Sequence, residues 1–147
     1  MKILFCTDGS IQNREAAIKA ADFIKNYREK PYVHVIYVHE SPALEAMRQL
    51  ETASDSDQVV KMDKESKQDA ENILNDTAKV FEERGIKVNK ELKNGKPVKN
   101  ILKFAKSEDI DLIILKNRTK KGLQKFLLGS VSNAIAQKAE ADVWIIK

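Results

Sequence analysis

Residues 2–10 read KILFCTDGS, an apolar run that is stopped by the turn residues Asp8 and Gly9. A short apolar run that ends in turn residues is typical of a buried strand, so we expect a strand from Lys2 to Thr7. Runs of the same kind recur along the chain at YVHVIYV (32–38), IDLIIL (110–115) and VWII (143–146). Residues 86–92 alternate apolar with polar side chains instead, which predicts a fifth strand, half exposed at an edge of the sheet.

Amphipathic stretches lie between these runs and predict four helices. We expect them at 13–28, with Asn13 as the N-cap, at 57–84, ended by Gly85, at 97–105 behind the turn 94–97, and at 130–140. Residues 39–56 form a polar connection, in which 43–50 is long enough for a turn or two of helix. Strands that alternate with helices predict an α/β fold, a doubly wound, open five-stranded parallel sheet with helices on both faces.

The chain has 147 residues, a size that suits one domain, and we expect a single domain over residues 1–147. Its net charge of +4 is too small for a dedicated nucleic-acid binder, and no apolar run approaches the ~20 residues that span a bilayer. A single cysteine, Cys6, excludes a disulfide framework, and the apolar run at the N-terminus is too short for a signal peptide. These features predict a cytoplasmic protein without a membrane or nucleic-acid partner.

Function in such a fold resides in loops at the carboxyl ends of the strands, where the direction of winding reverses. Two loops are candidates: Asp8-Gly9-Ser10 after the first strand, and KNRTKKGLQKFLLGS (116–130) after the fourth. The second loop ends in Gly129-Ser130 at a predicted helix start, whose free N–H groups and hydroxyls favour an anion. Its first half carries four cations, Lys116, Arg118, Lys120 and Lys121. They either hold a polyanion or form a solvated basic loop, in which Asp8 pairs with Lys116 or Arg118.

Other side chains with reactive groups favour structural roles. His34 and His39 have no cysteine or carboxylate pattern that would complete a metal site. Cys6 lies within an apolar strand, where a cysteine behaves as a small core residue. Trp144 in the last strand is expected either in the core or at a contact between subunits.

Five segments of the chain together resemble the universal stress protein family over its whole length. They are KILFCTDGS, YVHVIYVHE, the GKP before the third helix, DLIIL, and above all GLQKFLLGSVSNAIAQKAEADVWII. The resemblance implies the strand order 3-2-1-4-5, with the first and fourth strands adjacent where the winding reverses. It also implies a homodimer, which we expect to form through the last strand, Val143–Ile146.

The family resemblance further implies an adenine-nucleotide site, because many members bind ATP through a loop written G-x-x-G, nine residues, G-(S/T). In this chain the final pair is Gly129-Ser130, but Lys116 and Thr119 stand where the two earlier glycines belong. Glycines there let backbone N–H groups approach phosphate oxygens, so their loss weakens the cradle. Thr7 and Asp8 match the family's adenosine-contacting residues, while Cys6 replaces the usual proline. Val38 lies where the family lines the base pocket.

Three functions stay open on these grounds. The first is a non-catalytic, dimeric module in stress adaptation with a degenerate adenine-nucleotide site. The second is a nucleotide sensor that binds ATP with Mg²⁺, with or without weak hydrolysis. The third is a module that binds an anionic partner through the basic loop 116–121. We favour the first, without catalytic or metal-binding residues, and weigh ATP with Mg²⁺ equally against no cofactor. The residues expected to bind a nucleotide are Thr7, Asp8, Val38, Lys116, Arg118, Gly129, Ser130, Val131 and Ser132.

Overall fold

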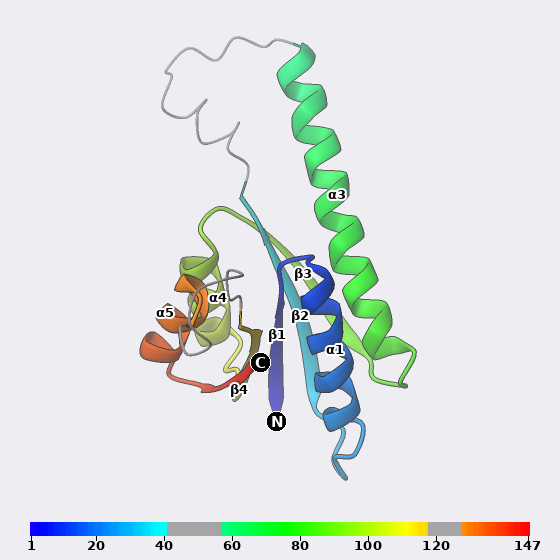
Figure 1. Ribbon diagram of the computed structural model, residues 1–147, viewed down its shortest axis with the longest axis vertical. Coiled ribbons are helices and arrows are strands. Elements are labelled where there is room, and N and C mark those ends of the chain that lie inside the picture. Colours follow the sequence, from blue (N-terminus) through cyan, green and yellow to red (C-terminus); the bar gives the residue numbers. More distant parts are fainter. Residues whose placement is uncertain (41–56, 118–127) are drawn as a thin grey trace.

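The computed structural model describes residues 1–40, 57–117 and 128–147, with only the backbone described for 57–63. Its elements are β1 (Lys2–Thr7), α1 (Ile11–Ile24), β2 (Tyr32–His39), α3 (Asp57–Glu82), β3 (Val88–Asn94), α4 (Pro97–Ser107), β4 (Leu112–Lys116), α5 (Ser130–Lys138) and β5 (Asp142–Ile146). The strands form one parallel sheet in the order β3-β2-β1-β4-β5, with α1 and α3 on one face and α4 and α5 on the other (Figure 1). The predicted fold class and the strand order implied by the resemblance are therefore confirmed.

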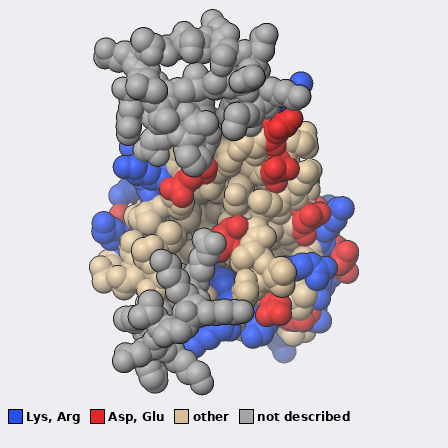
Figure 2. All heavy atoms as spheres, turned by 45° about the horizontal axis from the view of Figure 1, so that its top comes forward, with Lys and Arg blue, Asp and Glu red and all other residues tan. Residues whose placement is uncertain are grey.

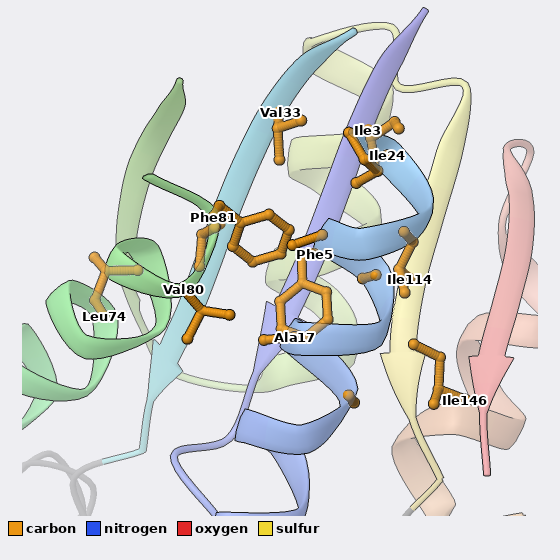
Figure 3. Packing of buried hydrophobic residues seen from close by; sticks show 14 residues of the cluster. Ile3, Phe5, Ala17, Ile24, Val33, Leu74, Val80, Phe81, Ile114 and Ile146 are labelled. Atoms are coloured by element: carbon orange, nitrogen blue, oxygen red, sulfur yellow. The ribbon is translucent and has the colours of Figure 1, made fainter. Parts of the chain in front are cut away.

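β1 is the centre of the sheet, and its side chains are buried on both faces. Ile3 and Phe5 pack toward α1 and α3, whereas Leu4 and Cys6 pack toward α4 and α5, as the twofold alternation of a strand requires. The rings of Phe5 and Phe81 meet edge to face, with their centroids 5.3 Å apart, at the middle of the α1/α3 side (Figure 3). Burial on both faces explains why β1 reads as a continuous apolar run.

The first helix begins earlier than the sequence suggested. Ser10, rather than Asn13, is the N-cap, and its hydroxyl accepts a hydrogen bond from the backbone N–H of Asn13 at 3.2 Å. Asn13 turns inward instead, where its side-chain amide donates to the carbonyl of Cys6 at 3.4 Å and is buried. α1 also ends at Ile24, so Tyr27 lies beyond the helix and is exposed.

The other predicted boundaries hold to within a few residues. β4 begins at Leu112 rather than Ile110, because the N–H of Ile110 bonds to Ala105 and closes the end of α4. Gly85 ends the α3 segment with φ +75°, as predicted, and β3 lies half exposed at the edge of the sheet. α5 ends at Lys138, before the predicted Glu140. The helical turns predicted at 43–50 lie outside the described residues.

Among the helices that the structure describes, none has the length and apolar character needed to span a membrane.

The turn after β1 is pressed against α3. Asp8 accepts hydrogen bonds at Oδ1 from the backbone N–H of Ser10 (2.9 Å) and from its hydroxyl (2.7 Å). Gly9 adopts φ +75°, and a Cβ atom placed on it would lie 2.8 Å from Cδ1 of Ile73 on α3. The turn therefore needs glycine for two separate reasons, its backbone conformation and the nearness of α3.

Gly9→Ala should lower the free energy of unfolding by about 2–3 kcal/mol, because left-handed strain and a clash with Ile73 add together. Gly85→Ala is the matched control, since Gly85 has the same φ of +75° but no atom within 4 Å of the added Cβ. That variant should lose only about 1 kcal/mol, the conformational part. Urea unfolding of both proteins measures the difference, and equal losses would show that Ile73 moves aside without cost.

Asp22 connects the end of α1 to the end of α3. Its Oδ1 lies 2.8 Å from Nζ of Lys25 and 3.0 Å from Nε of Arg84. Hydrogen bonds from Lys25 and then Arg84 lower the pKa of the Asp22 carboxyl below its ordinary value. The folded protein thus binds a proton on the Asp22 carboxyl less tightly than the unfolded chain does, so the carboxylate stabilises the fold at neutral pH.

Asp22→Asn should therefore reduce stability slightly at pH 7, with a loss that disappears in acid. The contribution of Asp22 is present above the unfolded pKa of about 4 and is lost as the pH falls through the lowered folded pKa. Urea unfolding between pH 7 and about pH 2 should show the wild-type and variant curves converging. Asp76→Asn is the control, because Asp76 and its partner Lys79 are both well exposed and 3.9 Å apart. A difference for Asp22→Asn that persists in acid would contradict this origin.

Candidate functional site

The two loops singled out from the sequence begin side by side at the carboxyl end of the sheet. β1 pairs in parallel with β4, with Cys6 opposite Leu115, so both strands end at the same edge. The winding reverses between these two strands, which is where open α/β sheets bind their ligands. Asp8 leaves β1 at this edge, while Lys116 and Asn117 end β4. The chain returns to the same edge at Gly129, directly before α5.

Strand alternation separates the predicted adenosine residues onto two faces. Val38 belongs to the buried cluster of the α4/α5 face together with Cys6. Thr7 points to the opposite face, where its hydroxyl lies 3.0 Å from that of Thr77 on α3 and is buried. Because Thr77 in turn donates to the carbonyl of Ile73, the Thr7 hydroxyl belongs to a closed internal network. Thr7 therefore presents its backbone, not its side chain, to the α5 side.

Asp8 lies half buried where β1 gives way to α1. Besides its bonds to Ser10, its negative charge acts on Tyr37, which occupies the register position beside Thr7 on β2. Burial, followed by the charges of Asp8 and Glu40, raises the pKa of the Tyr37 phenol. Tyr37 was not among the predicted site residues, and only the strand pairing reveals that it lies near Asp8.

α5 presents its N-terminus to this edge. Gly129 is the N-cap, Ser130 is exposed, Val131 is half buried and Ser132 is buried. The first N–H groups of a helix have no acceptor within the helix, so Ser130–Ser132 offer donors at this point. The hydroxyl of Ser132 is already used, because it donates to the carbonyl of Lys116 at 3.3 Å.

Asn117 is a second residue of this site that was not predicted from the sequence. The residue is 7% exposed, and its Oδ1 accepts a hydrogen bond from the backbone N–H of Gly129 at 3.2 Å. Its own backbone N–H donates to the carbonyl of Ile146 at 2.8 Å, which fixes it to the end of β5. An asparagine two residues after a predicted strand is a weak signal, since its partner Gly129 is 12 residues further along the chain.

Lys116, at the first position of the glycine motif, continues the sheet as a regular strand residue. It pairs with Ile146 of β5 and is half buried. Ile113 and Leu115 face α4 and α5, whereas Ile114 faces α1, so alternation places the Lys116 side chain on the α1 side. Its backbone needs no glycine, and its Cβ leaves the sheet on the face opposite α5.

The basic part of the loop, including the predicted site residue Arg118, lies outside the described residues, as does Thr119. Acidic and basic side chains are interspersed on the described surface that Figure 2 shows. The two roles weighed for the cations, holding a polyanion or forming a solvated loop, stay predictions.

A groove of about 420 Å³ lies on the other face of the sheet, between the start of α1 and α3. Thr7, Gly9 and Ser10 line it together with Arg14 of α1 and residues of α3. Its lining includes neither Val38 nor the start of α5. Thr7, which was predicted to contact the adenosine, thus lies in a groove on the face opposite Val38 and α5.

The histidines and the cysteine occupy structural positions. His34 is buried against Phe104, with its Nδ1 3.9 Å from Oε1 of Glu91, while Nε2 of His39 bonds to the hydroxyl of Ser66 at 2.8 Å. Within residues 1–40, 64–117 and 128–147, no group of three or more His, Cys, Asp and Glu side chains could hold a metal ion. Burial raises the pKa of the Cys6 thiol far above its ordinary value, so it is an unreactive core residue, as predicted.

Known proteins resemble this chain along its whole length. The model of the universal stress protein family matches residues 1–147. Universal stress protein MJ0531 of Methanocaldococcus jannaschii is 33% identical over 147 residues, which cover 99% of this chain and 81% of that protein. The solved structure of MJ0577, from the same organism, superposes with a TM-score of 0.78 at 25% identity and covers 99% of this chain and 94% of its own.

Two solved structures with bound nucleotides share the fold at lower identity. A universal stress protein from Archaeoglobus fulgidus in complex with dAMP has a TM-score of 0.62 and 21% identity, over 100% of this chain and 98% of its own. A universal stress protein in complex with cAMP has a TM-score of 0.68 and 17% identity, over 99% and 95%. The match to the family model and the identity to MJ0531 go beyond a shared fold. The chain belongs to the universal stress protein family.

Proposed function

We propose that this protein is a non-catalytic, dimeric module of stress adaptation that binds an adenine nucleotide weakly at the carboxyl ends of β1 and β4. The observation that carries the proposal is the start of α5, whose exposed Ser130 and first N–H groups open beside the ends of both strands. Such a helix start favours a phosphate group, since it combines unpaired donors with the positive end of the helix dipole. Val38, at the end of β2, supplies apolar surface on the same face for the base.

The nucleotide complexes of other family members support this choice of ligand. Two of the proteins that share the fold were solved with cAMP and dAMP, each of which carries an adenine base and a single phosphate. In our proposal Asp8 and Val38 lie around the adenosine part, with the backbone of Thr7. Gly129, Ser130, Val131 and Ser132 lie around the phosphate, and Mg²⁺ would accompany a triphosphate. Lys116 and Arg118 would contribute only charge, not a glycine cradle.

The groups at the helix start support a non-catalytic role. Hydrolysis of a phosphoanhydride needs a residue that orients or deprotonates the attacking water beside the phosphate. The described residues that belong to the first turn of α5 or bond to its start, namely Asn117, Val131 and Ser132, include no such base. Asp8 is directed by its Oδ1 toward Ser10. Weak ATP hydrolysis would therefore need groups from beyond this set.

Titration calorimetry with adenine nucleotides tests the site directly. We expect ATP with Mg²⁺ to bind more weakly than about 100 μM, or roughly −5.5 kcal/mol, because the glycine cradle is missing. Ser130→Glu should abolish binding, since its carboxylate occupies the place of the phosphate, yet it suits a helix start and should preserve the fold. Asn133→Glu is the control, because it adds the same charge to an exposed position of α5 one turn later.

Two outcomes would contradict this proposal. If no adenine nucleotide bound at millimolar concentration, the protein would not be a nucleotide-binding member of its family. If the Ser130→Glu and Asn133→Glu variants bound the nucleotide equally well, its phosphate would lie elsewhere.

The dimer is proposed to form through β5, which is an edge of the sheet. An edge strand carries a row of backbone groups without partners, and the half-buried VWI segment has no charged residue to discourage pairing. Next to this edge, the exposed Phe23 packs against Trp144 with ring centroids 4.9 Å apart, and Tyr27 packs against Phe23 at 5.3 Å. This aromatic cluster gives a second subunit apolar surface beside the strand.

Trp144→Glu should convert the dimer to a monomer, because it places a charge in the proposed interface. Sedimentation equilibrium at micromolar concentration measures the molar mass, and circular dichroism checks that the variant folds. Tyr32→Glu is the control, since Tyr32 is 71% exposed but begins β2, an internal strand. A wild-type protein that sediments as a monomer would refute the dimer.

A further inference from the structure

The outer side of α4 carries a line of lysines that begins at its N-cap. The three lysines within the helix fall in an arc of about 60° at 3.6 residues per turn. The buried residues of α4, Ile101, Phe104 and Ala105, lie on the opposite side of the helix. We call the four exposed cations the lysine ridge: Lys96, Lys99, Lys103 and Lys106.

The helices on this face of the sheet have charges of one sign. Neither α4 nor α5, which pack side by side, contains an aspartate or a glutamate (Figure 1). Lys138 of α5 adds another exposed cation. The helices of the other face, α1 and α3, both combine acidic with basic residues. The absence of acidic residues is therefore a property of the α4/α5 layer and not of the helices in general.

The lysine ridge opposes the stability of the helix that carries it. Lys96 makes no side-chain hydrogen bond as the N-cap, and the first turn of α4 has no acidic residue to offset cations at the positive end of the helix dipole. Neighbours along the ridge are three or four residues apart, a spacing at which like charges repel each other. Among the described residues, Lys106 is the one member of the ridge that reaches a carboxylate, that of Glu140 at 2.9 Å. A helix built against these local rules indicates that the lysines serve a purpose other than folding.

We infer that the lysine ridge is a docking surface for an acidic segment of a partner protein. Such a segment brings carboxylates to the cations along the roughly 15 Å between Lys96 and Lys106, and so removes the repulsion within α4. Pairing of two subunits through β5 leaves this surface open, because α4 packs over β2, on the far side of β1 from β5. The inference adds a partner to the module proposed above and does not depend on nucleotide binding.

The residues of the α4/α5 layer favour carboxylates over the phosphates of a nucleic acid or a membrane. Neither helix contains arginine, the side chain whose fork of donors suits phosphate. Their one aromatic residue, Phe104, is buried, so no ring of these helices is available to stack on a base. Val98 and Leu102, the other large apolar residues of α4, pack against the core and cannot enter a bilayer.

Fluorescence anisotropy with a labelled oligo-glutamate peptide and the full chain tests the ridge. The peptide should bind the wild type, and its affinity should fall as the salt concentration rises from about 20 to about 300 mM. Lys99→Gln combined with Lys103→Gln should lower the affinity about tenfold, because it removes the middle of the ridge. This variant loses a pair of like charges and keeps good helix formers, so it should unfold at a higher urea concentration than the wild type. Its loss of binding could then not be ascribed to misfolding.

Lys64→Gln combined with Lys67→Gln is the matched control, since it removes the same charge from two exposed positions of α3. The control should bind the peptide within about twofold of the wild type. Equal losses in the two double variants would show a response to net charge alone and would overturn the inference. Failure of the wild type to bind the peptide at low salt would overturn it as well.

Parallel titrations identify the class of partner, with vesicles that contain phosphatidylserine and with an oligodeoxynucleotide of the same charge as the peptide. We expect both to bind more weakly than the peptide. If either bound more tightly and lost its affinity in the Lys99 and Lys103 double variant, the partner would not be an acidic protein and the inference would fail. Each of these failures would leave the proposed nucleotide site untouched, because adenine nucleotides are titrated separately.

Discussion

β1 pairs with β2 on one side and with β4 on the other, and every part of the candidate site depends on this position. The pairing Cys6–Leu115 brings the turn at Asp8 beside the end of β4, although the two lie more than a hundred residues apart. β1 can occupy the centre of the sheet because it carries apolar side chains on both faces, and these are buried there. The buried apolar run at the N-terminus is thus the physical cause of the site as well as of the fold.

The same strand geometry limits what the site can contain. Consecutive residues of β1 point to opposite faces, so Cys6 and Thr7 cannot both contact a ligand with their side chains. Cys6 joins Val38 on the α5 side, and Thr7 joins Thr77 on the α3 side. Gly9 then allows the chain to pass close under α3 before α1 begins. A family motif therefore indicates which residues lie near a site, whereas the alternation of side chains along the strand determines which of them face it.

The helices and strands could be predicted from the sequence, because the burial of each one leaves a local pattern of apolar and polar residues. Apolar runs predicted four of the strands, and the alternation of apolar with polar residues predicted β3 at the edge of the sheet. The strand order came from the family resemblance, because local patterns do not encode which strands are neighbours. Ser10 and Asn13 can both cap a helix, and the Cys6 carbonyl, a tertiary partner, decides between them. Asn117 was missed for the same reason, since its role exists only through Gly129 and Ile146.

The replacement of glycine by Lys116 changes the site less by its charge than by the backbone that it permits. With lysine, β4 continues to residue 116 as a regular strand and delivers Asn117 to the start of α5. The backbone N–H of Gly129, in the site that we propose, is then satisfied by a neighbouring side chain instead of by water. A ligand that uses this N–H must displace the Asn117 side chain. Because the sheet holds that side chain beside Gly129, it competes with the ligand at a high effective concentration. Weak binding of a nucleotide is therefore the expected consequence of a helix start whose donor is already hydrogen-bonded.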